Sequence, residues 1–175
     1  MLKNVLAWRN NMLERFFPDD YVESAYKIDY AALYKQGIRG LIYDIDNTLV
    51  EHGADASKEA VALMKQLREI GFSICFLSNN KEPRVKRFNE PIQAPYLYKG
   101  GKPGRAGYEK AMQLLGTTKK TTVFIGDQLF TDIYGAKRTG IRNILVKPIG
   151  EKEEIQIVLK RYLERIVLHY YNKKK

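Results

Sequence analysis

Cysteine occurs once in these 175 residues, at Cys75 inside an apolar run, so no disulfide within the chain can stabilise the fold. We interpret Cys75 as a small buried core residue. Long apolar runs are also missing. No window of about 18 residues is apolar enough for a membrane-spanning helix, and residues 1–18 lack the continuous apolar core of a signal peptide. These absences favour a cytoplasmic protein in a reducing compartment.

Internal repeats, low-complexity tracts and domain linkers are absent from the sequence. A hydrophobic fraction of 45% over 175 residues is sufficient for one core of ordinary size. We therefore expect a single domain over residues 1–175. It divides into an N-terminal extension (1–38), a central core (39–148) and a C-terminal helix (151–175).

Acidic residues are outnumbered by basic ones: 20 Asp and Glu stand against 30 Lys and Arg, a formal net charge of +10. Such a chain attracts anions, whether phosphorylated molecules, nucleic acid or an acidic membrane surface, although the excess is equally explained by solubility alone. No nucleic-acid recognition motif of the usual kinds is present, so we expect no nucleic-acid partner. Residues 1–18 place apolar side chains among basic ones, which predicts an amphipathic helix that packs on the body or lies on a membrane.

The apolar pattern alternates along the chain between the period of a strand and that of a helix. Expected strands cover residues 39–43, 72–77, 121–125 and 141–146, with a short strand near Tyr96. Expected helices cover residues 30–35, 58–70, 83–89, 105–115, 131–139 and 151–171. This alternation favours an α/β fold: a three-layer, Rossmann-like parallel sheet with helices on both faces. The aromatic-rich last helix packs either on the body or on a partner, such as a second copy of the chain.

Polar residues follow three of the expected strands at the point where each strand ends. Asp44 and Asp46 follow the first strand, Ser78 and Asn79 the second, and Asp127 a later one. In parallel α/β sheets ligands bind beyond the C-terminal ends of the strands. An Asx-type turn explains a single acidic strand end, but three converging ends predict a site. Buried carboxylates need a metal or another cation as partner, and hard oxygen ligands suit Mg²⁺.

Four short motifs occur in order at these positions. They are D-I-D-N-T at residues 44–48, F-L-S-N-N at 76–80, K-P at 102–103 and G-D-x-x-x-x-D at 126–132. Together they resemble the haloacid-dehalogenase-like (HAD) phosphatases over about residues 40–148. The runs F-F-P-D-D-Y-V, I-R-G-L and D-N-T-L-V resemble the YqeG-type predicted phosphatases. That subgroup is similar to the mitochondrial phosphatidylglycerophosphate phosphatases.

The resemblance implies separate tasks for the paired carboxylates. Asp44 would be the nucleophile that attacks phosphorus and forms an aspartyl-phosphate. Asp46 would protonate the leaving oxygen and then activate water. A carboxylate at this second position implies phosphoryl transfer rather than dehalogenation. Mg²⁺ would be held by the Asp44 side chain, the Asp46 backbone carbonyl and Asp127, and would neutralise charge on the phosphoryl group.

The resemblance also implies a set of phosphate contacts. Lys102 would screen the repulsion between the phosphate and the nucleophile, and Ser78 would donate its hydroxyl to a phosphate oxygen with the Asn79 amide nearby. Each assignment has an alternative. Ser78 could be a helix cap, and Lys102 a solvated loop lysine for which Lys99 substitutes. Thr48 bonds either loop backbone or phosphate.

Three further polar residues carry less information. Asp132 ends the fourth motif and either orients the metal from behind its ligands or caps the helix expected at Thr131. His52 and His169 have no partners at metal-ligand spacing, so we expect both to be structural or surface residues.

Cap domains, which confer substrate choice in this superfamily, have no room in this sequence. The gaps from Asp46 to Ser57 and from Ser78 to Lys102 are 11 and 24 residues, too short for a folded cap. The resemblance therefore implies an open phosphomonoesterase site for a large or surface-displayed phosphate, or one covered by a neighbouring subunit. Phosphatidylglycerophosphate at an anionic membrane is one candidate. Phosphoproteins, nucleotides and small metabolites are alternatives, as is a regulatory binding protein of the same fold without useful turnover.

Overall fold

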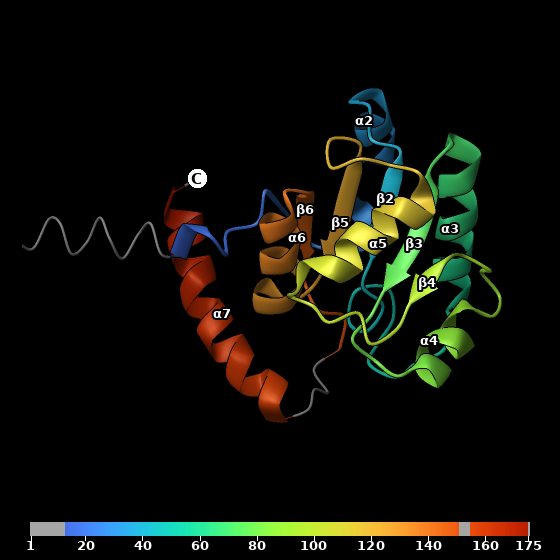
Figure 1. Ribbon diagram of the computed structural model, residues 1–175. Coiled ribbons are helices and arrows are strands. Elements are labelled where there is room, and N and C mark those ends of the chain that lie inside the picture. Colours follow the sequence, from blue (N-terminus) through green and yellow to red (C-terminus); the bar gives the residue numbers. More distant parts are fainter. Residues whose placement is uncertain (1–12, 151–154, 175) are drawn as a thin grey trace, which may run out of the picture.

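The computed structural model describes residues 13–150 and 155–174, and it contains a six-stranded parallel sheet (Figure 1). The strands are β1 (Asp20–Val22), β2 (Gly40–Tyr43), β3 (Ser73–Leu77), β4 (Tyr96–Leu97), β5 (Thr122–Gly126) and β6 (Arg142–Val146). Their order in the sheet is β1-β6-β5-β2-β3-β4, and every pairing is parallel. The predicted α/β class is confirmed.

The helices connect these strands and cover both faces of the sheet. They are η1 (Ala25–Lys27), α2 (Tyr30–Lys35), α3 (Lys58–Ile70), α4 (Glu82–Asn89), α5 (Arg105–Leu115), η2 (Leu129–Ile133), α6 (Tyr134–Thr139) and α7 (Ile155–Lys174). Successive strand side chains point to opposite faces. Leu41 and Tyr43 lie in one apolar cluster with α2, α3 and α4, whereas Ile42 and Cys75 lie in a second with α5 and α6. The sheet therefore forms the middle of three layers, with Cys75 buried as predicted.

Local sequence signals set the helix ends that position the site. The Ser57 hydroxyl accepts a hydrogen bond from Ala60 N at 3.1 Å, which caps the first turn of α3. Gly71 ends the same helix at φ 110°, a left-handed conformation that glycine adopts without strain. Similarly, the Asp29 carboxylate accepts from Ala32 N at 2.9 Å and begins α2. These ends match the sequence prediction because each rests on contacts within one turn.

The short helix η1 was not expected, and two further elements that bear on the sheet and the site differ from the sequence prediction. Strand β1 was not expected, since three half-buried residues are too short for a periodic signal; it pairs with β6, and the Asp19 carboxylate accepts from the Asn143 backbone N at 3.0 Å. The helix expected from residue 131 instead opens as the π-helical turn η2, in which Ile133 N bonds Gln128 O at 3.2 Å. Such wide turns often re-aim side chains at functional sites. Here the turn contains Asp132.

Helix α7 packs on the body along the β1–β6 side of the sheet (Figure 1). Val167 and Leu168 contact a cluster that includes Phe16 and Phe17, and the Phe17 and Tyr171 rings meet edge to face at 5.5 Å. Residues 13–17 of the N-terminal extension therefore pack on the body too. The other part of the amphipathic helix expected there, residues 1–12, lies outside the described residues. So does the expected start of the last helix, residues 151–154. Among the described helices, none has the length and apolar character needed to cross a bilayer.

Candidate active site

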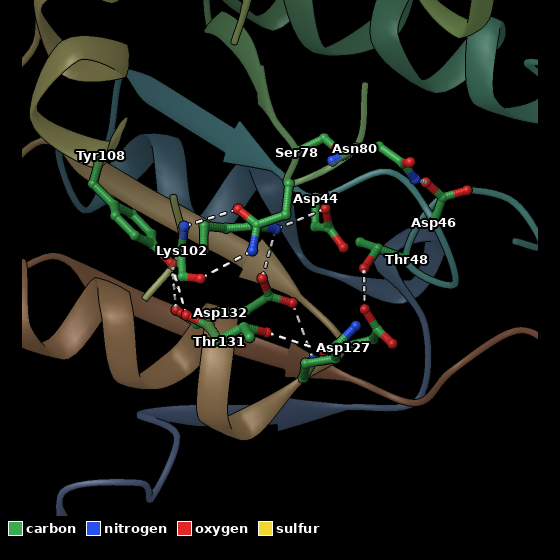
Figure 2. A network of polar contacts seen from close by, with 12 residues as sticks. Asp44, Asp46, Thr48, Ser78, Asn80, Lys102, Tyr108, Asp127, Thr131 and Asp132 are labelled. Atoms are coloured by element: carbon green, nitrogen blue, oxygen red, sulfur yellow. Dashed lines mark hydrogen bonds and ion pairs between the residues drawn. The ribbon is translucent and has the colours of Figure 1, made fainter. Parts of the chain in front are cut away.

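Three adjacent strands deliver the predicted polar residues to one edge of the sheet. Strand β2 lies between β5 and β3, with Tyr43 in register with both Ile125 and Phe76. The chain emerges from these strands at Asp44, Asp127 and Ser78, all of which are buried. Figure 2 shows the three side chains around one space, together with Lys102 from the loop before α5. The predicted convergence is therefore observed.

Lys102 lies between two carboxylates at the floor of this space. Its Nζ donates to Asp44 Oδ1 at 2.8 Å and to Asp132 Oδ1 at 2.7 Å. The Lys102 backbone is fixed by Asn79, whose amide accepts from Lys102 N at 2.8 Å and donates to Lys102 O at 2.9 Å. Lys99 is exposed on the same loop, so the buried cation is Lys102. Because both ends of the Asn79 amide bond Lys102, that side chain positions the lysine.

The ionisation of Asp44 is a balance between burial and Lys102. Burial raises the pKa of Asp44 to about 6, and the nearby Asp132 adds to the rise, while Lys102 opposes it. Burial also disfavours the charged lysine, but Asp132 and Asp44 outweigh it and raise the pKa of Lys102 above its usual value. Lys102 therefore stays protonated and limits the rise in the pKa of Asp44, which favours the anionic form that a nucleophile requires.

Asp44, Asp127 and Asp132 form a buried carboxylate trio, in which one oxygen from each lies within 4.8 Å of the others. Burial raises the pKa of Asp127 well above its usual value, and the charge of Asp132 adds to the rise. Lys102 and Arg161 each pair with members of the trio, but three buried carboxylates favour a further positive charge. Oxygen ligands at this spacing suit a small hard divalent cation such as Mg²⁺. The donor set of the trio thus fits the metal that the sequence predicted.

Asp132 does not cap a helix, because neither η2 nor α6 has a side-chain cap, and its carboxylate oxygens bind two different partners. Its Oδ2 accepts from Gln128 N at 3.1 Å, which closes the η2 turn, while its other oxygen accepts from Lys102. The Tyr108 hydroxyl donates to the carbonyls of Thr131 and Asp132, each at 3.0 Å, and so holds this turn from α5. Thr48 was expected to bond loop backbone or phosphate; its hydroxyl instead donates to Asp127 Oδ1 at 3.1 Å.

Asp46 lies away from Asp44 and faces different partners (Figure 2). Its Oδ1 accepts from Gly53 N at 2.7 Å and from Arg84 Nη2 at 2.9 Å, and its Oδ2 accepts from Asn80 Nδ2 at 3.0 Å. Burial raises the pKa of Asp46, but the Gly53 N–H, Arg84 and Asn80 outweigh burial and hold it below its usual value. Asp46 is therefore ionised, the form that accepts a proton from water. Proton donation by Asp46 is opposed by Arg84.

A cleft of about 250 Å³ gives access to these groups. Its lining consists of polar and charged side chains: Asp44, Asp46, His52, Ser78, Asn79, Asn80, Lys102, Gln128, Thr131 and Lys160. The Ser78 hydroxyl lines this cleft and also accepts from Asn80 N at 3.1 Å, so it combines a turn contact with access to a ligand. His52 is exposed, as expected of a surface residue; it also lines this cleft, with its Nδ1 4.0 Å from Asp46 Oδ1. His169 is exposed on α7, as expected.

Sequence reasoning missed three side chains that hold the acidic residues. Asn80 and Arg84 bind Asp46, and Arg161 of α7 binds Asp127. Asn80 belongs to the second motif, so its place in F-L-S-N-N was a usable signal. Arg84 and Arg161 carried none, because they are two of 30 basic residues and their partners are distant in sequence.

A parallel sheet whose strand ends hold a carboxylate pair, a buried lysine and an acidic trio defines the class of HAD-like hydrolases. A family model described as HAD-hydrolase-like matches residues 100–157, which include Lys102, Asp127 and Asp132. Over 165 residues the chain is 35% identical to the Probable phosphatase YqeG of Bacillus subtilis, covering 93% of this chain and 96% of that protein. The chain therefore belongs to the YqeG-type phosphatases of the HAD-like family.

Other relatives are more distant. The chain is 26% identical over 157 residues to the chloroplastic/mitochondrial phosphatidylglycerophosphate phosphatase 1 of Arabidopsis thaliana, covering 81% of this chain and 43% of that protein. An uncharacterised protein from Listeria monocytogenes shares the fold, with a TM-score of 0.53, 15% identity and coverage of 71% of this chain and 99% of that one. The cobalt-bound deoxy-D-mannose-octulosonate 8-phosphate phosphatase of Haemophilus influenzae also shares the fold, with a TM-score of 0.50 and 16% identity. The match covers 79% of this chain and 91% of that one.

Proposed function

We propose that the protein is a Mg²⁺-dependent phosphomonoester hydrolase that acts through an aspartyl-phosphate. The observation that carries this proposal is the buried contact between Lys102 and Asp44, a member of the acidic trio, in which both residues line a polar cleft. Asp44, Asp127 and Asp132 would hold the cation, with the Asp46 carbonyl as the further ligand expected from the sequence. Bound there, Mg²⁺ would neutralise charge on the transferred phosphoryl group.

The chain's own residues supply the covalent and proton-transfer steps. Asp44 attacks phosphorus, the bond to the leaving oxygen breaks, and that oxygen takes a proton from Asp46, which must carry that proton when the step begins although Arg84 opposes its protonation. A water then attacks the phosphorus of the aspartyl-phosphate and gives a proton to Asp46. This step releases phosphate and restores the Asp44 carboxylate. Lys102 stabilises the anions throughout, and Ser78 donates to a phosphate oxygen. The partners of Asp46 support the water-activating step most directly, because they favour its ionised form.

Phosphate release from p-nitrophenyl phosphate tests this activity. We expect hydrolysis with Mg²⁺, and loss of hydrolysis after EDTA or the substitution Asp44→Asn, because either change removes a group on which the first step depends. Turnover that survives Asp44→Asn would exclude the proposed nucleophile. A pure protein that binds phosphate but releases none from any substrate would favour a regulatory binding protein of the same fold.

For the substrate, we propose phosphatidylglycerophosphate presented at an anionic membrane surface. Similarity to the plant phosphatidylglycerophosphate phosphatase supports the lipid. The exposed face of α7 supports the membrane: Tyr162 is 65% exposed, and Leu163 and Ile166 are exposed beside it. The acidic residue within Lys160–Lys174 is Glu164, which is buried, so the exposed charges over this stretch are basic. Exposed apolar and basic side chains on one helix suit an anionic lipid surface.

The position of α7 links this surface to the cleft. Lys160, near the described start of that surface, lines the same cleft as Asp44 and Ser78. A membrane bound by α7 would therefore lie near the mouth through which a head-group phosphate enters. Peripheral binding of this kind is compatible with a cytoplasmic protein, which is the localisation we propose.

Vesicle experiments separate the lipid from the other substrate classes. We expect sedimentation with vesicles that contain phosphatidylglycerol, weaker sedimentation for Tyr162→Ser combined with Ile166→Ser, and no change for Leu114→Ser, an exposed leucine on α5. We also expect faster phosphate release from phosphatidylglycerophosphate in vesicles than from soluble phosphomonoesters. Faster turnover of a phosphopeptide, nucleotide or sugar phosphate would instead identify one of those classes.

A further inference from the structure

A chain of polar contacts connects α7 with the acidic trio. The backbone N of Leu129, in η2, donates to Glu164 Oε1 at 2.7 Å. Arg161 Nη1 donates to Glu164 Oε2 at 2.9 Å and to the Asp127 carbonyl oxygen at 2.6 Å. Arg161 Nη2 also donates to Asp127 Oδ2. One guanidinium thus binds the main chain and the side chain of the same acidic residue.

Burial of these three charged side chains costs desolvation free energy, and the packing of α7 on the body does not require it. The Arg161 side chain is 15% exposed, that of Glu164 is 6% and that of Asp127 is 0%. Taking such charges out of water is expensive, and apolar side chains of similar size often serve stability as well or better. Val167 and Tyr171 already anchor α7 by apolar contact farther along the helix. The charges near Asp127 therefore point to a task at Asp127.

The two oxygens of Asp127 have separate protein donors. Thr48 donates to Oδ1, and Arg161 donates to Oδ2. With a donor at each oxygen and another contact on its carbonyl, the carboxylate cannot rotate freely. Carboxylate oxygens retain lone pairs after accepting one hydrogen bond, so these contacts leave coordination sites for a metal.

We propose that Arg161 is a positioning residue of the metal centre, which fixes Asp127 so that its carboxylate faces Asp44 and Asp132. Glu164 in turn orients Arg161. The inference rests on the proposed Mg²⁺-dependent function and extends it, because it makes the C-terminal helix part of the metal site. A planar arginine fork can make both contacts to Asp127, whereas the ammonium group of a lysine acts as a point charge.

The test is metal affinity, measured with Mn²⁺ by electron paramagnetic resonance and with Mg²⁺ by calorimetry, in the absence of substrate. We expect Arg161→Met to weaken binding by about 10–100-fold, the usual effect of removing a group that orients a metal ligand. Arg161→Lys should lie between Arg161→Met and the wild type. Glu164→Gln should weaken binding less than Arg161→Met. The control is Arg165→Met, which removes an exposed arginine of the same helix and should leave affinity unchanged.

Circular dichroism and thermal unfolding in EDTA show which variants fold. Unchanged Mn²⁺ affinity in folded Arg161→Met would overturn the proposal. So would tighter binding, since it would mean that Arg161 competes with the metal for Asp127. If Arg161→Met does not fold, wild-type affinity in Arg161→Lys would overturn the proposal instead. Failure of the wild type itself to bind either metal would refute the Mg²⁺-dependent function, a separate result.

Discussion

Asp44 and Asp46 follow the same strand two residues apart, yet their surroundings shift their pKa values in opposite directions. Asp44 is buried against Lys102 and near Asp132, and its pKa rises to about 6. Asp46 accepts hydrogen bonds from Gly53, Arg84 and Asn80, and its pKa falls despite burial. Two identical side chains thus obtain different chemistry from their neighbours. The comparison supports the proposal that Asp44, a member of the carboxylate trio, attacks phosphorus and that Asp46, beside Arg84, transfers the proton.

The largest expected effect comes from Asp44 itself. Asp44→Asn retains the shape of the side chain but removes the nucleophilic carboxylate, so we expect phosphate release to fall by about 10³-fold or more. The measurement is hydrolysis of p-nitrophenyl phosphate at saturating Mg²⁺. Asp55→Asn, at an exposed residue that pairs with Arg87, is the matched control and should keep wild-type activity.

Removal of the Lys102 ammonium group, which contacts Asp44, should have the next largest effect on activity. Lys102→Met leaves Asp44, Asp132 and the incoming phosphate without their shared ammonium group, and we expect kcat to fall by about 10²–10³-fold. The control is Lys99→Met, which removes an exposed lysine from the same loop and should change kcat little. Equal losses in the two variants would contradict the assignment of Lys102 as the buried cation of the site.

The Asp46 side of the comparison predicts a change in pH dependence. Arg84 helps to hold the pKa of Asp46 down, so Arg84→Met should raise that pKa. On acidification Asp46 would then become protonated at a higher pH than in the wild type. The acidic limb of the pH profile of kcat should therefore move to higher pH. Arg87→Met removes an exposed arginine of the same helix and should leave the limb in place. If the acidic limb of the kcat profile does not move in Arg84→Met, Arg84 does not control the ionisation of Asp46 during catalysis.

Smaller effects on stability should also differ between the two carboxylates. The lowered pKa of Asp46 means that its ionised form contributes stability above the pKa of the unfolded chain, and that this contribution is lost as pH falls through the folded pKa. The raised pKa of Asp44 has the opposite sign, so its ionisation reduces stability as pH rises through about 6. In EDTA at pH 7 we therefore expect Asp46→Asn to lower the free energy of unfolding by about 1–3 kcal/mol, because Arg84 loses a partner.

Urea unfolding of both variants in EDTA makes this comparison directly. Asp44→Asn should be at least as stable as the wild type under these conditions, since it removes a buried charge. A greater loss of stability in Asp44→Asn than in Asp46→Asn would reverse the electrostatic contrast on which the two roles depend.

The parts of the fold that the sequence predicted share a local cause. Ser57 and Gly71 define α3 through contacts within one turn, and the central strands are continuous apolar runs. Strand β1 is three residues long and exists because β6 lies beside it, so no periodic signal could reveal it. The η2 turn depends on Asp132 bonding Gln128, a contact that ordinary helix signals do not encode.

The same distinction separates the predicted from the missed site residues. Asp44, Ser78 and Asp127 directly follow strands, and the strand order alone brings them together. Arg84 and Arg161 reach the site from helices whose rotation and placement depend on packing across the whole domain. Their contacts join residues 38 and 34 positions apart, which a single sequence does not reveal.

Trapping of the phosphoryl-enzyme tests the division of labour between Asp44 and Asp46 most directly. Asp46→Asn should still react with p-nitrophenyl phosphate, whose leaving group needs little protonation, but should hydrolyse the intermediate slowly. Rapid acid quench followed by peptide mass spectrometry should therefore find one phosphoryl group on Asp44 in Asp46→Asn and none in Asp44→Asn. A phosphoryl group on another residue, or turnover by Asp46→Asn at the wild-type rate, would contradict the assignment of attack to Asp44 and proton transfer to Asp46.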